Sequence, residues 1–259
     1  MTEALLRAGT FASLVVILAI AEWRWPRNPA APDRRHRWPV NFVLGAIDVV
    51  AVRGLMPWLA VDAARWSMLH RVGLLRLADV SPLIGAMLGF VLLDLAVYAQ
   101  HVVSHRIPVL WRLHRLHHTD LVLDVSSAVR FHPLEILLSM AFKIGIVLLL
   151  GVSVGAVIAF EAALSAFALF THANLALPAG LDEALRRLFV TPDMHKIHHS
   201  VARAEHDRNF GFQFAVWDRL FGTYLARATN PPARIRIGLG EFRSPADQRL
   251  PALLVQPLR

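Results

Sequence analysis

Long apolar stretches are the dominant pattern along this chain. A helix needs about 20 predominantly apolar residues to cross the hydrocarbon core of a bilayer. Residues 5–21, 40–61 and 82–103 reach or approach this length, although Asp48 and Arg53 interrupt the second stretch. Each of the three stretches therefore predicts one membrane-spanning helix.

A fourth apolar stretch, residues 136–170, is too long for a single span. A helix rises about 1.5 Å per residue, so a straight helix of this length would exceed the thickness of the bilayer core. Glycines at 151 and 155 mark a place where the stretch can turn back. We therefore predict a helical hairpin here, and an all-α integral membrane bundle of four to five spans.

The composition agrees with a membrane protein. Hydrophobic residues make up 56% of the 259 residues and charged residues only 18%, whereas soluble chains are about half apolar and about a quarter charged. The first apolar stretch has a weakly basic flank and no small-residue cleavage site, so it predicts a span rather than a signal peptide. No linker divides the chain, which predicts one structural unit.

Positive charge predicts the orientation. The net charge is +8, almost entirely from arginine, and the loop at residues 24–37 is strongly basic. Cytoplasmic loops of membrane proteins collect such residues, so this loop is expected in the cytoplasm. Residues 62–79 then lie outside, as an interfacial helix, and residues 171–259 lie in the cytoplasm. The arginines in residues 62–79 run against this orientation.

Histidine supplies the candidate chemistry. The chain has 13 histidines and no cysteine, so a metal ion can be held only by histidine, aspartate or glutamate. Two H-x-x-H-H motifs and one H-x-x-x-H motif place side chains three or four residues apart, on one face of a helix. Neutral imidazole suits iron, zinc, copper and nickel. The eight histidines of these motifs are His101, His105, His114, His117, His118, His195, His198 and His199.

His172 is a further candidate ligand, and His132 is a candidate either for a ligand or for a group that orients a ligand. His172 sits where the predicted hairpin returns, and His132 precedes Pro133 between the second motif and the hairpin. The remaining lone histidines, His36, His70 and His206, are interpreted as surface or satisfied core residues.

Acidic residues near the motifs are candidates for orienting the ligands. Metal-bound imidazoles usually donate their second N–H group to a carboxylate or carbonyl. Asp94, Glu135, Asp193 and Asp207 lie close enough in sequence to accept such bonds. Asp94 also lies within an apolar span, where an acidic group is costly unless it is paired, so it is a functional candidate by default.

At these residues the chain resembles the fatty acid hydroxylase superfamily, also called the sterol desaturase family. The resemblance covers residues 92–223. It includes the three histidine motifs, Leu110-Trp111-Arg112, Arg130-Phe131-His132-Pro133, His172-Ala173-Asn174, Asp207-Arg208-Asn209-Phe210-Gly211 and Trp217-Asp218-Arg219-Leu220-Phe221-Gly222-Thr223. In domain terms, residues 81–225 resemble the catalytic domain, 1–80 form the preceding spans and loops, and 226–259 form a cytoplasmic tail.

The resemblance implies two iron ions, O2 activation and a lipid substrate. It implies ligand roles for the eight motif histidines and an additional ligand in His172. Asp207 and Asn209 resemble positions that orient ligands. No electron-carrier domain accompanies the motifs, so a separate electron-donor protein is expected. Zinc is expected as a substitute for iron in a purified sample, and the arginine bias favours a bacterial inner membrane.

The sequence is compatible with several substrates and functions. The substrate is expected to be a fatty acyl, sterol or hopanoid, carotenoid or related lipid, and the same metal centre can either hydroxylate or desaturate it. A non-catalytic metal-binding or transport protein is the alternative from another class, but transporters place ligands near the bilayer midplane, whereas these motifs lie at span ends. Nucleic-acid binding is not expected, because the chain lacks a recognisable motif for it.

Overall fold

A computed structural model describes residues 2–29 and 34–259. Five of its helices are long and apolar enough to cross a membrane. Four of them correspond to α1 (Thr2–Arg24), α5 (Pro82–Arg106), α7 (Pro133–Leu150) and α8 (Val154–His172), and the fifth begins with α2 (Arg34–Leu55). No β-strand occurs in the described ranges, so the predicted all-α bundle with its hairpin is confirmed.

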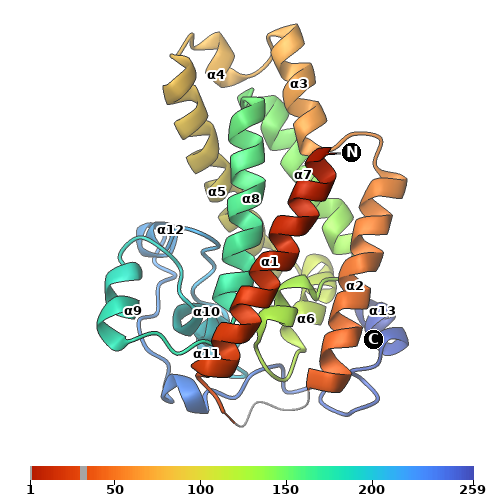
Figure 1. The fold of residues 1–259 in the computed structure, drawn as a ribbon, viewed down its shortest axis with the longest axis vertical. Helices are drawn as coiled ribbons and strands as arrows, with labels where there is room; N and C mark the ends of the chain where they lie inside the picture. The colour runs from red at the N-terminus through yellow and green to blue at the C-terminus, as the bar shows by residue number, and fades with distance from the viewer. Residues whose placement is uncertain (1, 30–33) are drawn as a thin grey trace.

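Residues 62–79 form helix, as expected, but much of it packs into the bundle. They contain most of α3 (Ala60–His70) and all of α4 (Leu74–Leu77), at the upper end of the view in Figure 1. Ala60, Ala63 and Ala64 are fully buried in one core with residues of α5, α7 and α8. Small side chains on one face let α3 approach these helices closely, so it does not lie alone at an interface.

Local signals set the hairpin between α7 and α8. Gly151 ends α7 in the left-handed conformation, with φ of 70°, which glycine adopts without a steric penalty. A Cβ on Gly151 would also lie 2.7 Å from the carbonyl oxygen of Val72. Ser153 then caps α8 by accepting a hydrogen bond from the Ala156 N–H group. The turn therefore falls where the sequence predicted it.

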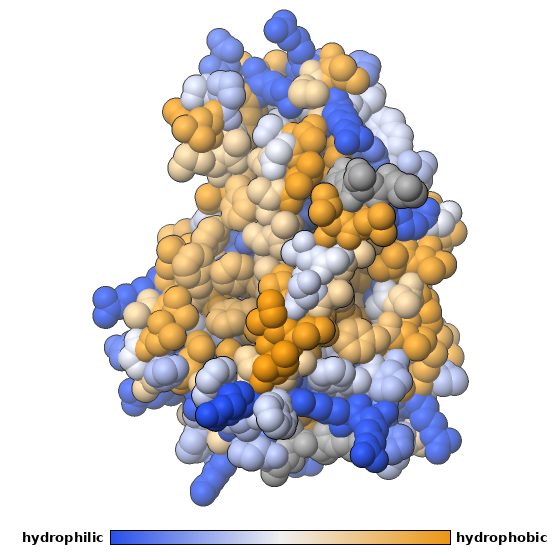
Figure 2. Space-filling view, viewed as in Figure 1, coloured by the Kyte–Doolittle hydropathy of each residue, from blue (hydrophilic) through white to orange (hydrophobic). Residues whose placement is uncertain are grey.

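Hydrophobic side chains cover the middle of the molecule. Figure 2 shows them across the middle of this face, with hydrophilic side chains gathered at the upper and lower ends. Large apolar residues such as Ile17, Val50 and Leu83 are more than half exposed on the long helices. A surface of this size without polar groups fits hydrocarbon rather than water.

Short helices form a cap at the lower end of the bundle in Figure 1. They are α6 (Pro108–His118), η1 (Val125–Val129), α9 (Ala179–Leu185), α10 (Pro192–His198), α11 (Arg203–His206), α12 (Val216–Leu220), η2 (Pro232–Arg234), α13 (Leu250–Leu254) and η3 (Gln256–Leu258). Residues 226–259 contribute the last three of these helices to the cap, and Leu253 shares a buried cluster with Leu44 and Leu116. The tail thereby joins α2 to α6.

Candidate metal centre

Nine buried histidines meet where the long helices enter the cap. Five of them offer nitrogen atoms within 4.8 Å of one another, and the other four do the same in a second group. The first group is His101, His105, His114, His118 and His198, and the second is His117, His172, His195 and His199. The structure thus brings together all eight motif histidines and His172, although they come from α5, α6, α8 and the α10 region.

In the first group, backbone carbonyls fix which ring nitrogen faces the centre. Nδ1 of His101 lies 2.8 Å from the carbonyl oxygen of Phe210, and Nδ1 of His198 lies 2.8 Å from that of Arg208. A carbonyl only accepts, so each Nδ1 carries the proton and each Nε2 carries a lone pair. Both Nε2 atoms are buried and lack a hydrogen-bond partner among the described residues.

In the second group, two ring nitrogens lie so close together that their lone pairs require a cation. Nδ1 of His117 donates to the Arg130 carbonyl at 3.2 Å, and Nδ1 of His172 donates to the Ala168 carbonyl at 2.7 Å. The two Nε2 lone pairs then face each other at 3.0 Å, which is repulsive unless a cation lies between them. Metal–nitrogen bonds of about 2.0–2.1 Å place two ligands of one ion roughly 3.0–3.4 Å apart. The donor set therefore fits a metal ion.

The histidines of the cap are held in the form that binds metal. Burial lowers their pKa values well below the ordinary imidazole value, and the neighbouring histidines add to the effect. This applies to His117, His118, His195, His198 and His199. Neutral imidazole is the metal-binding form, so these side chains are prepared for a cation at neutral pH.

Two of the predicted acidic residues contact the histidines. Nδ1 of His114 donates to Oε1 of Glu135 at 2.6 Å, and Oδ1 of Asp207 lies 3.5 Å from Nδ1 of His105. A carboxylate that accepts such a bond fixes the tautomer and orientation of a ligating ring, as Glu135 does for His114. Asp207 lies near His105 without a hydrogen bond, because Nδ1 of His105 has no hydrogen-bond partner among the described residues. Glu135 is mostly buried, whereas Asp207 is 43% exposed.

Three other predicted positions bind the cap instead of the histidines. Asp94 accepts a 2.8 Å hydrogen bond from Nε1 of Trp217. Asn209 donates to the Met194 carbonyl at 3.1 Å, and Asp193 pairs with Arg27. These three side chains contact other parts of the chain rather than a ligating ring, and Oδ1 of Asp94 has no hydrogen-bond partner among the described residues. Their roles as orienting groups stay predictions.

His132 is also placed differently from its prediction as a ligand. Its Nδ1 accepts from the Leu134 N–H group at 3.2 Å and caps α7, where Pro133 is the first residue. Its Nε2 then carries the proton and donates to the Leu254 carbonyl at 3.1 Å. Both nitrogens are engaged, so neither is open to a metal ion.

Replacing His132 by alanine should therefore leave the metal content unchanged. The loss of the α7 cap is expected to cost about 1 kcal/mol of stability. Metal analysis of the purified protein and its thermal unfolding in detergent would measure the two effects. A fall in metal content without a fall in unfolding temperature would restore His132 as a ligand.

His206 is a residue whose position the sequence reasoning missed. Its ring centroid lies 4.5 Å from that of His118 and 4.9 Å from that of His105. It is 6% exposed, its Nδ1 has no partner in the described chain, and burial lowers its pKa to about 4. Together with His105 and Asp207 it offers three close donor atoms. Its position, seven residues after the last histidine motif, is the feature of the sequence that could have identified it.

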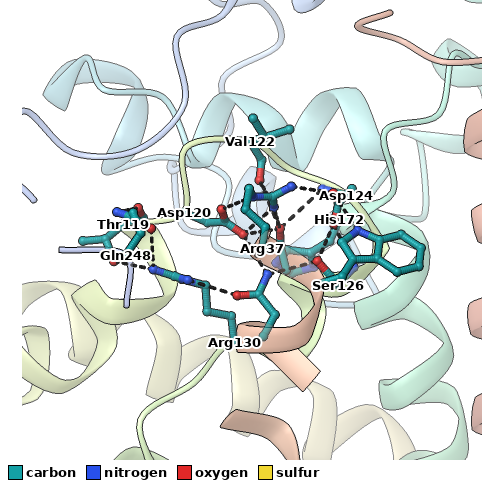
Figure 3. Close-up of polar contacts among 12 residues, drawn as sticks. Arg37, Thr119, Asp120, Val122, Asp124, Ser126, Arg130, His172 and Gln248 are labelled. Atoms are coloured by element: carbon teal, nitrogen blue, oxygen red, sulfur yellow. Dashed lines mark hydrogen bonds and ion pairs between the residues drawn. The ribbon is translucent and has the colours of Figure 1, made fainter. Parts of the chain in front are cut away.

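A buried ionic network lies beside the second histidine group. Arg37 of α2 makes a two-point contact with Asp120 at 2.7 and 2.8 Å and bonds Asp124 at 2.6 Å. Figure 3 shows Arg37 between these two carboxylates, with His172 nearby. Burial alone would raise the pKa of Asp120, but Arg37 and Arg130 hold it below its usual value. In the sequence, Arg37 is one of several arginines in a basic loop, and nothing there points to these two partners.

Arg130 links this network to the ligands. Its guanidinium donates to Asn41 at 3.0 Å and to Gln248 at 2.9 Å, while its own carbonyl receives the His117 N–H group. Figure 3 shows Arg130 reaching toward Thr119 and Gln248. The side chain is fully buried, at 1% exposure. Contacts from α2 and from the C-terminal tail thus fix the backbone that holds His117.

An apolar cavity of about 390 Å³ opens beside the histidines. His101, His114, His117 and His195 form part of its wall. The remaining wall is mostly hydrophobic and comes from several long helices, including Phe11, Val97, Met140, Leu164 and Leu169. A cavity of this size and character suits the apolar part of a lipid.

Comparison with known proteins places this site in a family. A family model described as fatty acid hydroxylase matches residues 86–223, more than half of the 259-residue chain. All nine grouped histidines fall within the matched range.

Curated relatives match over the same part of the chain. Ornithine lipid hydroxylase OlsE of Rhizobium tropici is 34% identical over 151 residues, which cover 56% of this chain and 42% of that protein. Alkylglycerol monooxygenases of Danio rerio and Homo sapiens are each 30% identical over 138 residues, covering 53% of this chain and 30% of those proteins. The match thus spans less than half the length of each relative. No solved structure matches the chain.

Proposed function

The chain belongs to the fatty acid hydroxylase family, and from this premise we propose that it is a membrane-bound monooxygenase that hydroxylates a lipid with O2 and two iron ions. The names of its relatives describe lipid hydroxylation and ether-lipid monooxygenation. The observation that carries the proposal is the opening of an apolar cavity onto both histidine groups.

The proposed roles follow from the contacts. Bound iron would supply the oxidising power for an unactivated C–H bond, which side chains lack. The nine histidines would hold the ions, and Glu135 and Asp207 would keep His114 and His105 oriented. The apolar wall would align the lipid and exclude water from the reacting carbon.

The catalytic unit would include more than residues 81–225. That segment carries every grouped histidine, but Phe11 and Gly45 form part of the cavity wall. The first two long helices would therefore shape the substrate site, and the C-terminal tail would steady the ligand-bearing cap. We further propose that the cap faces the cytoplasm of a bacterial inner membrane, where a separate protein donates electrons.

A comparison of total lipids from cells with and without the gene tests this function. The expected result is a lipid heavier by one oxygen atom that appears only with the intact gene. A product lighter by two hydrogens would instead establish a desaturase. Purified protein should contain two iron ions and, when supplied with an electron donor, consume O2 only when lipid is present. A single exchangeable ion with no O2 consumption would contradict the proposal.

A further inference from the structure

Asp48 is a carboxylate without a partner in the apolar part of the bundle. It lies on α2, only 6% exposed, and its Oδ1 has no hydrogen-bond partner in the described part of the chain. A buried acidic group in a membrane span is costly unless something neutralises or hydrogen-bonds it. The structure therefore leaves Asp48 ready for a group that the described chain does not supply.

A second open carboxylate oxygen faces the same cavity. Asp48 and Glu135 both line the cavity that ends at the histidines. Glu135 uses Oε1 to bind His114, while its Oε2 is buried and has no hydrogen-bond partner in the part of the chain that the structure describes. Burial and the like charge of Glu135 both disfavour the ionised form of Asp48. A cation that donates hydrogen bonds to both carboxylates would offset these two costs, because ionised carboxylate oxygens only accept hydrogen bonds.

The lysine in the cavity wall already has a partner. Lys143 is the third residue with a formally charged side chain in the lining, and it pairs with Glu161 at 3.3 Å. Arg7 pairs with the same Glu161 at 2.8 Å. No salt bridge to Asp48 occurs among residues 2–29 and 34–259 as described. The one lysine of the lining is therefore paired, whereas Asp48 and Glu135 each keep a carboxylate oxygen without a partner in the described chain.

We propose that Asp48 and the free oxygen of Glu135 form a subsite for a protonated amino group of the lipid substrate. A primary ammonium carries three N–H donors, enough to serve both oxygens, and its charge neutralises Asp48. A hydroxyl group has one donor and no charge, so it leaves one oxygen unmet. This subsite rests on the proposed lipid hydroxylase function and specifies a substrate class for it.

Binding of two simple lipids to the purified protein tests the subsite. Tetradecylamine and 1-tetradecanol share one chain and differ in the head group, so their affinities at pH 7 in one detergent isolate the amine. The wild-type protein should bind the amine at least about tenfold more tightly, as close charge pairs in buried sites do. Equal affinities would overturn the proposal.

The variant Asp48→Asn assigns the preference to this residue. It keeps the side-chain shape and removes the charge, so the amine should lose its advantage while 1-tetradecanol binds as before. Glu183→Gln removes an exposed carboxylate of α9 that does not line the cavity and should leave both affinities unchanged. A wild-type amine preference that survives in Asp48→Asn would overturn the assignment. Should this variant fail to fold, the wild-type comparison still decides whether an amine subsite exists.

The binding test and the lipid-product test refute different proposals. Amine binding requires neither O2 nor turnover, so a protein that prefers the amine but yields no oxidised lipid would refute the hydroxylase function. A protein that oxidises a lipid without any amine preference would refute the subsite alone.

Discussion

Replacing His198 by alanine is expected to abolish lipid oxidation and lower the metal content of the protein. His198 comes from α10 and contributes to the five-histidine group, with Nδ1 fixed by the Arg208 carbonyl. Its Nε2 is buried and unpartnered, so alanine would remove a ligand that nothing nearby replaces. Residues that merely orient ligands typically change metal affinity or activity by about 10- to 100-fold, and a ligand should exceed that range.

Metal analysis and product formation measured on the same preparation would check this result. His36→Ala is the matched control, because His36 is an exposed residue of α2 and belongs to neither histidine group. It should retain full metal content and turnover. Unchanged metal content and turnover in His198→Ala would refute the ligand assignment, and loss of metal in His36→Ala would show that the grouping is incomplete.

Replacing Arg37 by methionine is expected to destabilise the protein by about 3–5 kcal/mol, the usual effect of breaking a buried ion pair on one side. The substitution leaves Asp120 and Asp124 buried without their shared cation. It should also lower metal content, because the same network holds the backbone around Arg130 that orients His117. Chemical unfolding in detergent micelles and metal analysis would measure the two effects.

Arg53→Met is the control, since Arg53 is an exposed arginine of the same helix. Its effect should stay within about 0.5 kcal/mol. Similar stability losses in both variants would contradict the role given to the network.

The ion pair also predicts how stability depends on pH. The folded pKa of Asp120 is depressed, so its stabilising contribution is present above about pH 4 and is lost as the pH falls toward the folded pKa. Acid unfolding of the wild-type protein should therefore be steeper below pH 4 than that of Arg37→Met. Parallel acid-unfolding curves would show that Asp120 does not contribute.

The long helices were predictable because crossing a bilayer is decided by local apolar length. The stretch at residues 136–170 needed a turn, and α7 and α8 meet at Gly151, where the sequence placed it. The histidine motifs were predictable for a similar reason, since residues three or four apart share one helix face. His172 was located from its position at the end of the returning helix.

The hydrogen bonds made by residues around the metal ligands were harder to predict, because they join segments far apart in sequence. Asp94 lies only two turns before His101, yet its Oδ2 accepts from Trp217 of a distant segment. His132 is near the second motif, yet Leu254 of the tail takes its Nε2. Proximity along the chain carried no information about these partners.

The sequence by itself determined that the chain forms a membrane bundle and carries its histidines in metal-binding patterns, because apolar length and helical spacing act within single helices. Tertiary structure alone divided nine histidines into two groups, brought His206 beside them and paired Arg37 with Asp120. The tertiary structure also places Asp48, which only interrupts an apolar stretch in the sequence, in the wall of a cavity. These arrangements depend on how separate helices pack, and that packing is fixed by contacts over the whole chain.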